Sequence, residues 1–305
     1  MDCILQKTLQ KKFVNNRGIT RIEPEWDEDA VRECPICGGI KHLEIMEEGY
    51  RTVRPCPGMF ALKRIDAYNR AGVPSRFMNA TFDNYKLDRI HEPSTIKTFI
   101  QKIKNYQKGA SGFLLEGGPG TGKTHLLCAA IRYLTLELGV SCLYIDYSNL
   151  LSDIRASYSQ NISESTHIEP LADIPVLFID ELGKGRDKKN DFELRIIDEI
   201  INRRYLNPDL TTIFASNYRD RDTSGYNNYM RAGYGTDTRQ WEEFSRKRYK
   251  SENFPNDRAF MAYVDQLMKT EHIEDRVSDR TASRILAIAA PTYIDASDYR
   301  RNPGI

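Results

Sequence analysis

The residues best suited to chemistry form a glycine-rich stretch, which reads GGPGTGKT over residues 117–124. The spacing Gly-x4-Gly-Lys-Thr is typical of a phosphate-binding loop, in which backbone N–H groups surround phosphate oxygens at the start of a helix. In such a loop, Lys123 would reach the β- and γ-phosphates, and the Thr124 hydroxyl would ligate Mg²⁺. The alternative, a glycine-rich turn before an ordinary helix, is disfavoured because an apolar run precedes the loop and an amphipathic stretch follows it. The pattern predicts that the chain binds a nucleoside triphosphate through Gly117, Gly118, Pro119, Gly120, Thr121, Gly122, Lys123 and Thr124.

A second candidate group, Asp180 and Glu181, follows the continuous apolar run 175–179. Such a run is typical of a parallel strand that is buried on both faces. We expect Asp180 to hold Mg²⁺, usually through water, and Glu181 to orient and deprotonate an attacking water. Asn217 follows another apolar run, 211–216, where its amide would hydrogen-bond the same water or the γ-phosphate as a sensor; the alternative is an asparagine that caps a turn.

The N-terminal part of the chain contains residues with the spacing of a metal site. Cys34 and Cys37 form a Cys-Pro-Ile-Cys-Gly-Gly knuckle, in which two thiolates bind one ion. Cys56 offers a third thiolate, and His42 is the nearest fourth ligand, with Cys3 as a remote alternative. We expect Zn²⁺ to be bound by Cys34, Cys37, His42 and Cys56; the alternative is a loop of free cysteines without metal.

The composition excludes some broad classes of protein. The 305 residues are 40% apolar, which is enough for a buried core, and the net charge of +1 gives no overall attraction to nucleic acid. No apolar run reaches membrane-spanning length, and the N-terminus lacks a signal-peptide pattern. We therefore expect a cytoplasmic protein without a membrane partner, whose six cysteines are not paired in disulfides.

Alternating strands and helices are expected to position the candidate residues. Buried strands are indicated by four apolar runs, at residues 113–115, 141–146, 175–179 and 211–216. Helical stretches between them predict an α/β fold, a parallel sheet with helices on both faces. The glycine-rich loop, Asp180 and Asn217 should then meet at the carboxyl ends of the strands, where such sheets bind ligands. The polar residues 157–170 are expected to form a loop.

We place a domain boundary near residue 72, where a basic helical connector ends before Pro74. Residues 1–71 are predicted to form a partner-binding module, and its first 30 residues are expected to be a mobile arm or a small binding element. Residues 72–305 are predicted to form the nucleotide-binding domain. Aromatic residues at positions 77, 82 and 85 suit a segment that packs on the edge of that domain.

Taken together, these motifs resemble those of the AAA+ ATPases. The resemblance is carried by GGPGTGKT, by Val-Leu-Phe-Ile-Asp-Glu-Leu-Gly at 176–183 and by Ile-Phe-Ala-Ser-Asn at 213–217. Two further segments look like those of helicase loaders of the DnaC/DnaI type, which are related to the IstB transposition helpers. They are GVPSRFMNATFDNY at 72–85 and EDRVSDR at 274–280.

This resemblance implies an AAA+ (ASCE P-loop NTPase) fold behind a small zinc-finger-like module, with ATP and Mg²⁺ as ligands and ATP hydrolysis as the activity. It implies the ATP-dependent loading of a replicative DNA helicase onto single-stranded DNA, with self-association through the AAA+ domain. The N-terminal module would bind the helicase. By its position in the motif, Arg280 would be an arginine finger for a neighbouring subunit, and Arg300 of Asp-Tyr-Arg a second sensor.

Three arginines compete for the finger role. Arg276, Arg280 and Arg284 are spaced four residues apart, which would place them on one helical face. The alternative is that they form surface salt bridges with Asp275 and Asp279.

Two features depart from the family pattern. Gly58 stands where such loaders usually have a further cysteine. Residues 218–271 form an insertion, with a basic and aromatic stretch at 239–250. That stretch suits either a partner or nucleic-acid surface, or a solvated helix that packs Trp241 and Phe244 on the core.

Two other functions stay open. One is an IstB-like transposition helper, an ATPase that bends duplex DNA; the cysteine module argues against it, and a preference for duplex DNA would favour it. The other is a nucleotide-switch adaptor with little turnover, which turnover measured in the presence of DNA would distinguish.

Overall fold

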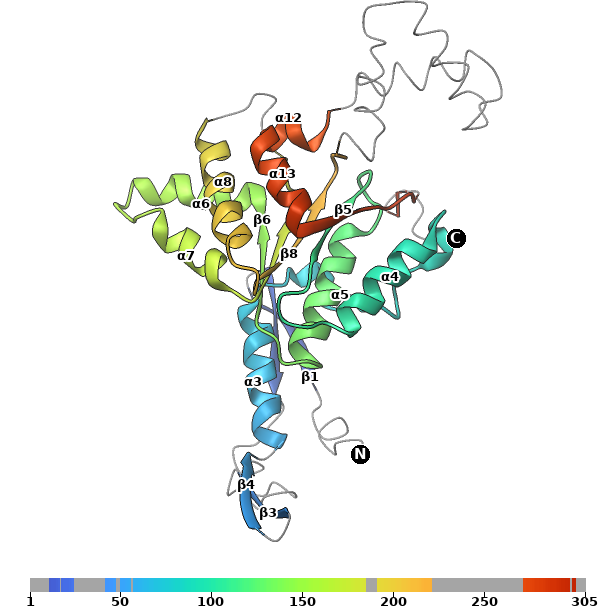
Figure 1. The fold of residues 1–305 in the computed structure, drawn as a ribbon, viewed down its shortest axis with the longest axis vertical. Helices are drawn as coiled ribbons and strands as arrows, with labels where there is room; N and C mark the ends of the chain where they lie inside the picture. Colours follow the sequence, from blue (N-terminus) through green and yellow to red (C-terminus); the bar gives the residue numbers. More distant parts are fainter. Residues whose placement is uncertain are drawn as a thin grey trace, which may run out of the picture.

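A five-stranded parallel sheet forms the centre of the chain in the computed structural model (Figure 1). The structure describes residues 11–16, 18–24, 42–47, 50–55, 57–184, 191–220, 271–296, 298 and 299. The strand order is β6–β7–β8–β5–β9, and all neighbouring strands are parallel. The strands are β5 (Gly112–Glu116), β6 (Cys142–Asp146), β7 (Val176–Asp180), β8 (Thr211–Ser216) and β9 (Ala289–Tyr293).

Helices cover both faces of this sheet, and the strand residues alternate between two cores. Phe113 and Leu115 of β5 belong to one core, which includes α4 (Pro93–Lys104) and α5 (Lys123–Leu136). Leu114 belongs to the other, which is formed with α6 (Tyr147–Tyr158), α7 (Ser165–Asp173), α8 (Asp191–Tyr205), α12 (Ile273–Val277) and α13 (Asp279–Ile288). Figure 1 shows the two groups of helices on either side of the strands. The predicted α/β fold, with a parallel sheet and helices on both faces, is confirmed.

Residues 11–16 and 18–24 form a hairpin against this domain, so of the two expectations for the first 30 residues, the mobile arm does not hold for these residues and the small binding element stays a prediction. β1 (Lys11–Asn16) and β2 (Ile19–Pro24) pair antiparallel. The Asn69 side chain accepts a hydrogen bond from the Ile22 N–H at 2.7 Å and donates one to the Ile22 carbonyl at 3.0 Å. The Ile22 side chain is buried in the core of α4 and α5. These partners lie far along the chain, which is why the local sequence did not reveal them.

A long helix leads from a second hairpin to the sheet. The hairpin consists of β3 (His42–Glu47) and β4 (Tyr50–Pro55), and it is followed by α3 (Pro57–Arg70). In Figure 1 the hairpin lies at the end of α3 that is remote from the sheet. None of the helices in the described ranges is long and apolar enough to cross a membrane.

Two elements differ from the sequence expectation. Part of the expected loop 157–170 is helical, because α7 begins at Ser165 and continues past Pro170. Its residues Ile168 and Leu171 are buried, so packing compensates for the proline. Strand β9 was not expected; it pairs with β5 on the side away from β8.

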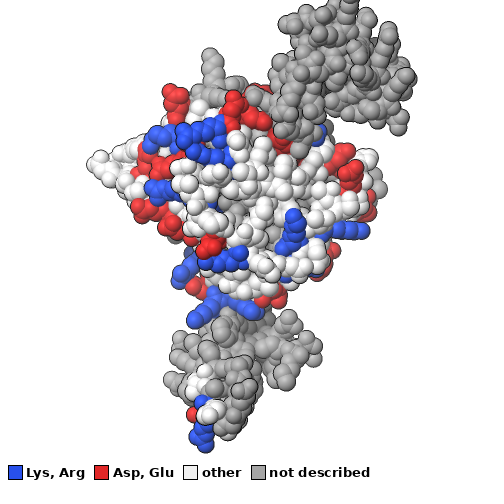
Figure 2. Space-filling model, in the orientation of Figure 1, with Lys and Arg blue, Asp and Glu red and all other residues white. Residues whose placement is uncertain are grey.

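Charged side chains of both signs are intermixed on the face shown in Figure 2. Ion pairs also link the helices of one face of the sheet: Arg155 of α6 pairs with Glu193 of α8 at 2.5 Å, and Arg195 of α8 pairs with Glu164, the N-cap of α7, at 2.6 Å.

A buried arginine joins the last turn of α8 to the start of β8. Arg204 is 1% exposed. Its guanidinium group donates to the carbonyl oxygens of Leu171, Ile174 and Thr211 at 2.8, 2.9 and 2.7 Å, and to the Thr212 hydroxyl at 2.8 Å. Burial lowers the pKa of Arg204 to about 10, so the group is still protonated near neutral pH. Arg204 thus satisfies backbone acceptors at the amino-terminal edge of the sheet.

We expect Arg204→Met to lower the free energy of unfolding by about 3 kcal/mol or more, because it leaves several buried carbonyl oxygens without a donor. Urea denaturation measures this loss. Arg203→Met is the matched control, since the neighbouring Arg203 is exposed and pairs with Glu199 of its own helix, at 2.9 Å. The control should change stability by less than about 1 kcal/mol. Equal losses for the two variants would contradict the role assigned to Arg204.

Candidate active site

The glycine-rich loop connects β5 to α5 at the carboxyl edge of the sheet. Gly117, Gly120 and Gly122 have φ angles of +154°, +79° and +91°, which side-chain-bearing residues rarely adopt. Gly122 is the N-cap of α5, so the loop delivers its backbone N–H groups to the positive end of a helix. The predicted strand–loop–helix arrangement of a phosphate-binding loop is present.

Lys123, the first residue of α5, directs its ammonium group back over the loop. Its Nζ donates to the carbonyl oxygens of Gly117 and Gly118, both at 2.8 Å. Lys123 is only 8% exposed, so the positive charge of its ammonium group lies within the loop and is largely shielded from solvent. Phosphate oxygens are strong acceptors for an ammonium donor, and this position suits a triphosphate bound in the loop.

Asp180 lies at the carboxyl end of β7 and is 3% exposed. Its carboxylate accepts hydrogen bonds from the Tyr144 hydroxyl at 2.8 Å and from the Glu181 N–H at 2.9 Å. Burial raises the pKa of Asp180, and hydrogen bonds from Thr124 and Tyr144 act against this rise. The structure therefore brings together the two expected Mg²⁺ ligands, Thr124 and Asp180.

Glu181 and Asn217 come together at the ends of β7 and β8. Glu181 has a φ of +55°, and its carboxylate forms an ion pair with Lys184 at 3.5 Å. The Asn217 amide donates to the same carboxylate oxygen, also at 3.5 Å. The expected base, Glu181, and the expected sensor, Asn217, are thus neighbours, and Lys184 contacts the base.

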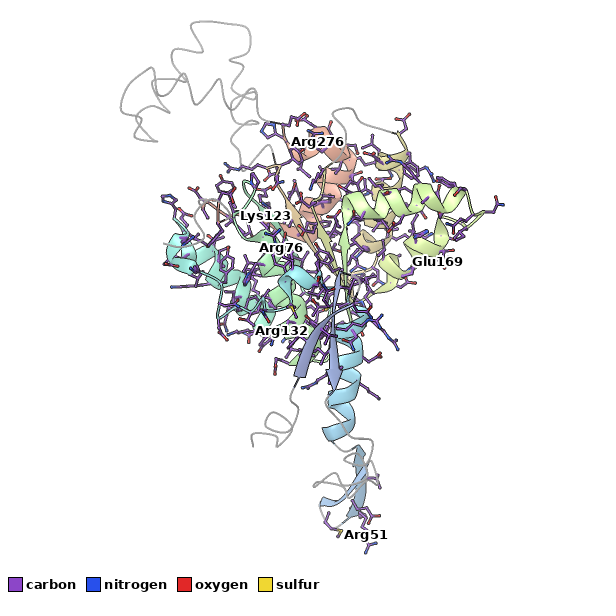
Figure 3. All side chains as sticks on the ribbon, turned by 180° about the vertical axis from the view of Figure 1, so that it is seen from behind. Arg51, Arg76, Lys123, Arg132, Glu169 and Arg276 are labelled. Atoms are coloured by element: carbon purple, nitrogen blue, oxygen red, sulfur yellow. The ribbon has the colours of Figure 1, made fainter. Side chains whose placement is uncertain are left out.

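A cavity of about 620 Å³ lies over these groups. Lys123 and Arg76, both labelled in Figure 3, line it; they come from α5 and from η1 (Ser75–Phe77). Lys123, Thr124, Asp180, Glu181 and Asn217 share this cavity with a set of aromatic side chains, Phe77, Tyr85, His125, Tyr144 and Tyr299. Phe77 and Tyr85 were expected to pack on the domain edge, and they also face the cavity. Sequence reasoning did not identify Tyr144 and Tyr299 as lining residues: Tyr144 lies within an apolar strand run, and Tyr299 was noted only as the residue before Arg300.

The three candidate arginines do not share one helical face. Ser278, with a φ of +97°, ends α12 and is the N-cap of α13, so Arg276 belongs to a different helix from Arg280 and Arg284. Arg276 pairs with Glu271 and lies over the Tyr218 ring at 4.6 Å. Arg284 pairs with Asp198 at 2.8 Å. Arg280 is exposed and makes no hydrogen bond or ion pair with any residue in the described part of the chain.

Several expected residues lie outside the described residues: Cys34, Cys37 and Cys56 of the zinc site, Arg300, and residues 221–270 of the insertion. Among the described residues, no group of three or more His, Cys, Asp or Glu side chains could hold a metal ion. The backbone of His42 pairs with that of Pro55, the residue before Cys56 in the sequence.

Comparison with known proteins identifies relatives of this chain. The model of the IstB-like ATP binding protein family matches residues 71–218. The chain is 30% identical over 206 residues to the replicative helicase loader DnaC of Buchnera aphidicola subsp. Baizongia pistaciae (strain Bp), covering 67% of this chain and 74% of that protein. It is 32% identical over 146 residues to DnaC of Buchnera aphidicola subsp. Acyrthosiphon pisum (strain APS), covering 47% of this chain and only 58% of that protein. A solved structure of the DnaC helicase loader has a TM-score of 0.48 and 19% identity, covering 72% of this chain and 99% of that one.

We expect Tyr144→Phe to weaken Mg²⁺-dependent ATP binding by about tenfold, because Asp180 loses a hydrogen bond that orients its carboxylate. The dissociation constant of ATP, measured by calorimetry over a range of Mg²⁺ concentrations, reports this effect. Tyr147→Phe is the control, since the Tyr147 hydroxyl donates to the Glu193 carbonyl at 3.2 Å and not to Asp180. Unchanged binding in Tyr144→Phe, or an equal loss in both variants, would contradict this role.

Proposed function

The chain belongs to the family of DnaC-type AAA+ proteins, which are ATP-binding P-loop NTPases, and we propose that it loads a replicative DNA helicase onto single-stranded DNA. The proposal rests on one observation above all: Lys123, Thr124, Asp180, Glu181 and Asn217 line a single cavity. The name shared by its relatives, replicative helicase loader, supports the helicase as partner.

We propose that this site hydrolyses ATP. Lys123 would hold the β- and γ-phosphates, and Thr124 and Asp180 would hold Mg²⁺, which neutralises charge on the phosphates when bound. Glu181 would take a proton from the water that attacks the γ-phosphorus, and Asn217 would orient that water. Lys184 forms an ion pair with the Glu181 carboxylate, at 3.5 Å.

We also propose that Arg280 acts on the ATP site of a neighbouring copy. Arg276 and Arg284 are engaged in ion pairs with their own chain, to Glu271 and Asp198. Arg280 is exposed on α13, and the part of the chain that the structure describes offers it no such partner. An arginine that reaches a neighbour's γ-phosphate makes hydrolysis depend on assembly.

The N-terminal module, residues 1–71, is proposed to bind the helicase and to hold Zn²⁺ through Cys34, Cys37, His42 and Cys56. The pairing of His42 with Pro55 supports this ligand set, because it brings the backbone of His42 next to the residue that precedes Cys56. Elemental analysis that finds no zinc in the purified chain would refute the metal site.

The assembly proposal predicts that two inactive variants complement each other. Arg280→Ala should lower turnover by about 10³, and Glu181→Gln should still bind ATP but hydrolyse it very slowly. A mixture should regain turnover, since Glu181→Gln supplies the arginine and Arg280→Ala supplies the base. The measurement is ATP turnover against protein concentration, with and without single-stranded DNA, and Arg203→Ala is the control.

The other outcomes distinguish the alternatives. Normal turnover in Arg280→Ala, or no recovery on mixing, would refute the assigned arginine. A slow rate that is indifferent to DNA and to protein concentration would favour a nucleotide-switch adaptor. Stimulation by duplex DNA in place of single strands would favour a transposition helper.

A further inference from the structure

The described residues that follow β9 run beside the phosphate-binding loop. β9 pairs with β5 as far as Tyr293, which lies opposite Glu116. Beyond the strand, the Ile294 N–H donates to the Glu116 carbonyl at 2.7 Å, and the Tyr299 N–H donates to the Gly120 carbonyl at 3.0 Å. Residues 294–296, 298 and 299, here called the C-terminal segment, therefore follow the loop past the end of the sheet.

The loop has room for the backbone of this segment because Gly117 lacks a side chain, and the space beside Gly120 is occupied by the Asp298 carboxylate. A Cβ atom on Gly117 would lie 2.6 Å from the Ile294 carbonyl oxygen, and one on Gly120 would lie 1.8 Å from a carboxylate oxygen of Asp298. Both distances are too short for atoms in contact. The shape of the loop and the position of the C-terminal segment thus depend on each other.

Tyr299 is held from three further directions. Its hydroxyl donates to the Lys86 carbonyl at 2.7 Å. The Arg89 guanidinium group lies 5.4 Å from the centre of its ring, and the Tyr85 ring lies at 6.4 Å with an angle of 46° between the planes. Burial raises the pKa of Tyr299, so its hydroxyl remains a donor at neutral pH. These contacts join the C-terminal segment to residues 85–89.

The residues that line the cavity are of two chemical kinds. The polar and charged residues Lys123, Thr124 and Asp180 suit the phosphates and Mg²⁺. Phe77, Tyr85, His125 and Tyr299 supply aromatic surface to the same cavity. Aromatic rings stack on the flat face of a nucleic-acid base, whatever its identity.

We propose that Tyr299 is a nucleotide-binding residue whose ring contacts the base of ATP, so that the C-terminal segment forms part of the ATP site. This inference rests on the ATP site proposed above. It assigns to Tyr299 a contact with the base and not with the phosphates, and this difference makes it testable.

The test compares ATP with inorganic tripolyphosphate, which carries the phosphates without a base. Their dissociation constants are measured by calorimetry in Mg²⁺ buffer for the full chain and for Tyr299→Ala. We expect the variant to bind ATP about tenfold more weakly or worse, as for other losses of base stacking, and to bind tripolyphosphate normally. Tyr299→Phe keeps the ring and loses only the bond to Lys86, so it should retain most of the affinity for ATP. Tyr205→Ala is the control, since Tyr205 is an exposed tyrosine at the end of α8.

Each other result would overturn the inference. Unchanged ATP affinity in Tyr299→Ala would exclude a contact with the base. Equal losses for ATP and tripolyphosphate would mean that Tyr299 supports the loop only. Tighter binding of both would mean that the C-terminal segment obstructs the site. If the unaltered chain fails to bind ATP, the proposed ATP site itself is wrong.

Discussion

The curvature of the phosphate-binding loop is the constraint on which the rest of the site depends. The chain turns from β5 into α5 through left-handed glycine conformations at Gly120 and Gly122. Neighbouring segments reinforce the need for glycine: a Cβ on Gly122 would lie 2.8 Å from the Tyr85 ring, and one on Gly120 would meet Asp298. Residues that lie far before and far after the loop in the sequence, Tyr85 and Asp298, therefore surround it together.

The order of the strands turns this loop into a site. β5 lies next to β8, and β7 lies on the other side of β8, so the parallel strands end at one edge with Lys123, Asn217 and Asp180 close together. Separate cores on the two faces support the sheet, and Arg204 joins α7, α8 and β8 at the opposite edge. The geometry of the candidate site thus depends on packing in the two cores and on the Arg204 contacts at the opposite edge of the sheet.

Features encoded by neighbouring residues were predictable from the sequence. The loop, the four strands from β5 to β8 and the acidic pair each depend on a short local pattern, and the parallel order then brings them together. Tyr144 and Tyr299 were missed because their partners, Asp180 and Lys86, are far away in the chain. The break between α12 and α13 had a signal in the sequence, because serine is a preferred N-cap residue. In the structure, Ser278 accepts the hydrogen bond of an N-cap from the Thr281 N–H. The four-residue spacing of Arg276, Arg280 and Arg284 instead led to the prediction of one continuous helix.

The central claim is that ATP binding at this site drives the loading of a helicase, and its most direct test measures the product. A replicative helicase is incubated with closed circles of single-stranded DNA, ATP and the full chain, and the helicase retained on the DNA is quantified. The account predicts retention well above that of the helicase alone, and no such increase with Lys123→Ala. Retention no higher than that of the helicase alone, from a chain that binds ATP normally, would contradict it.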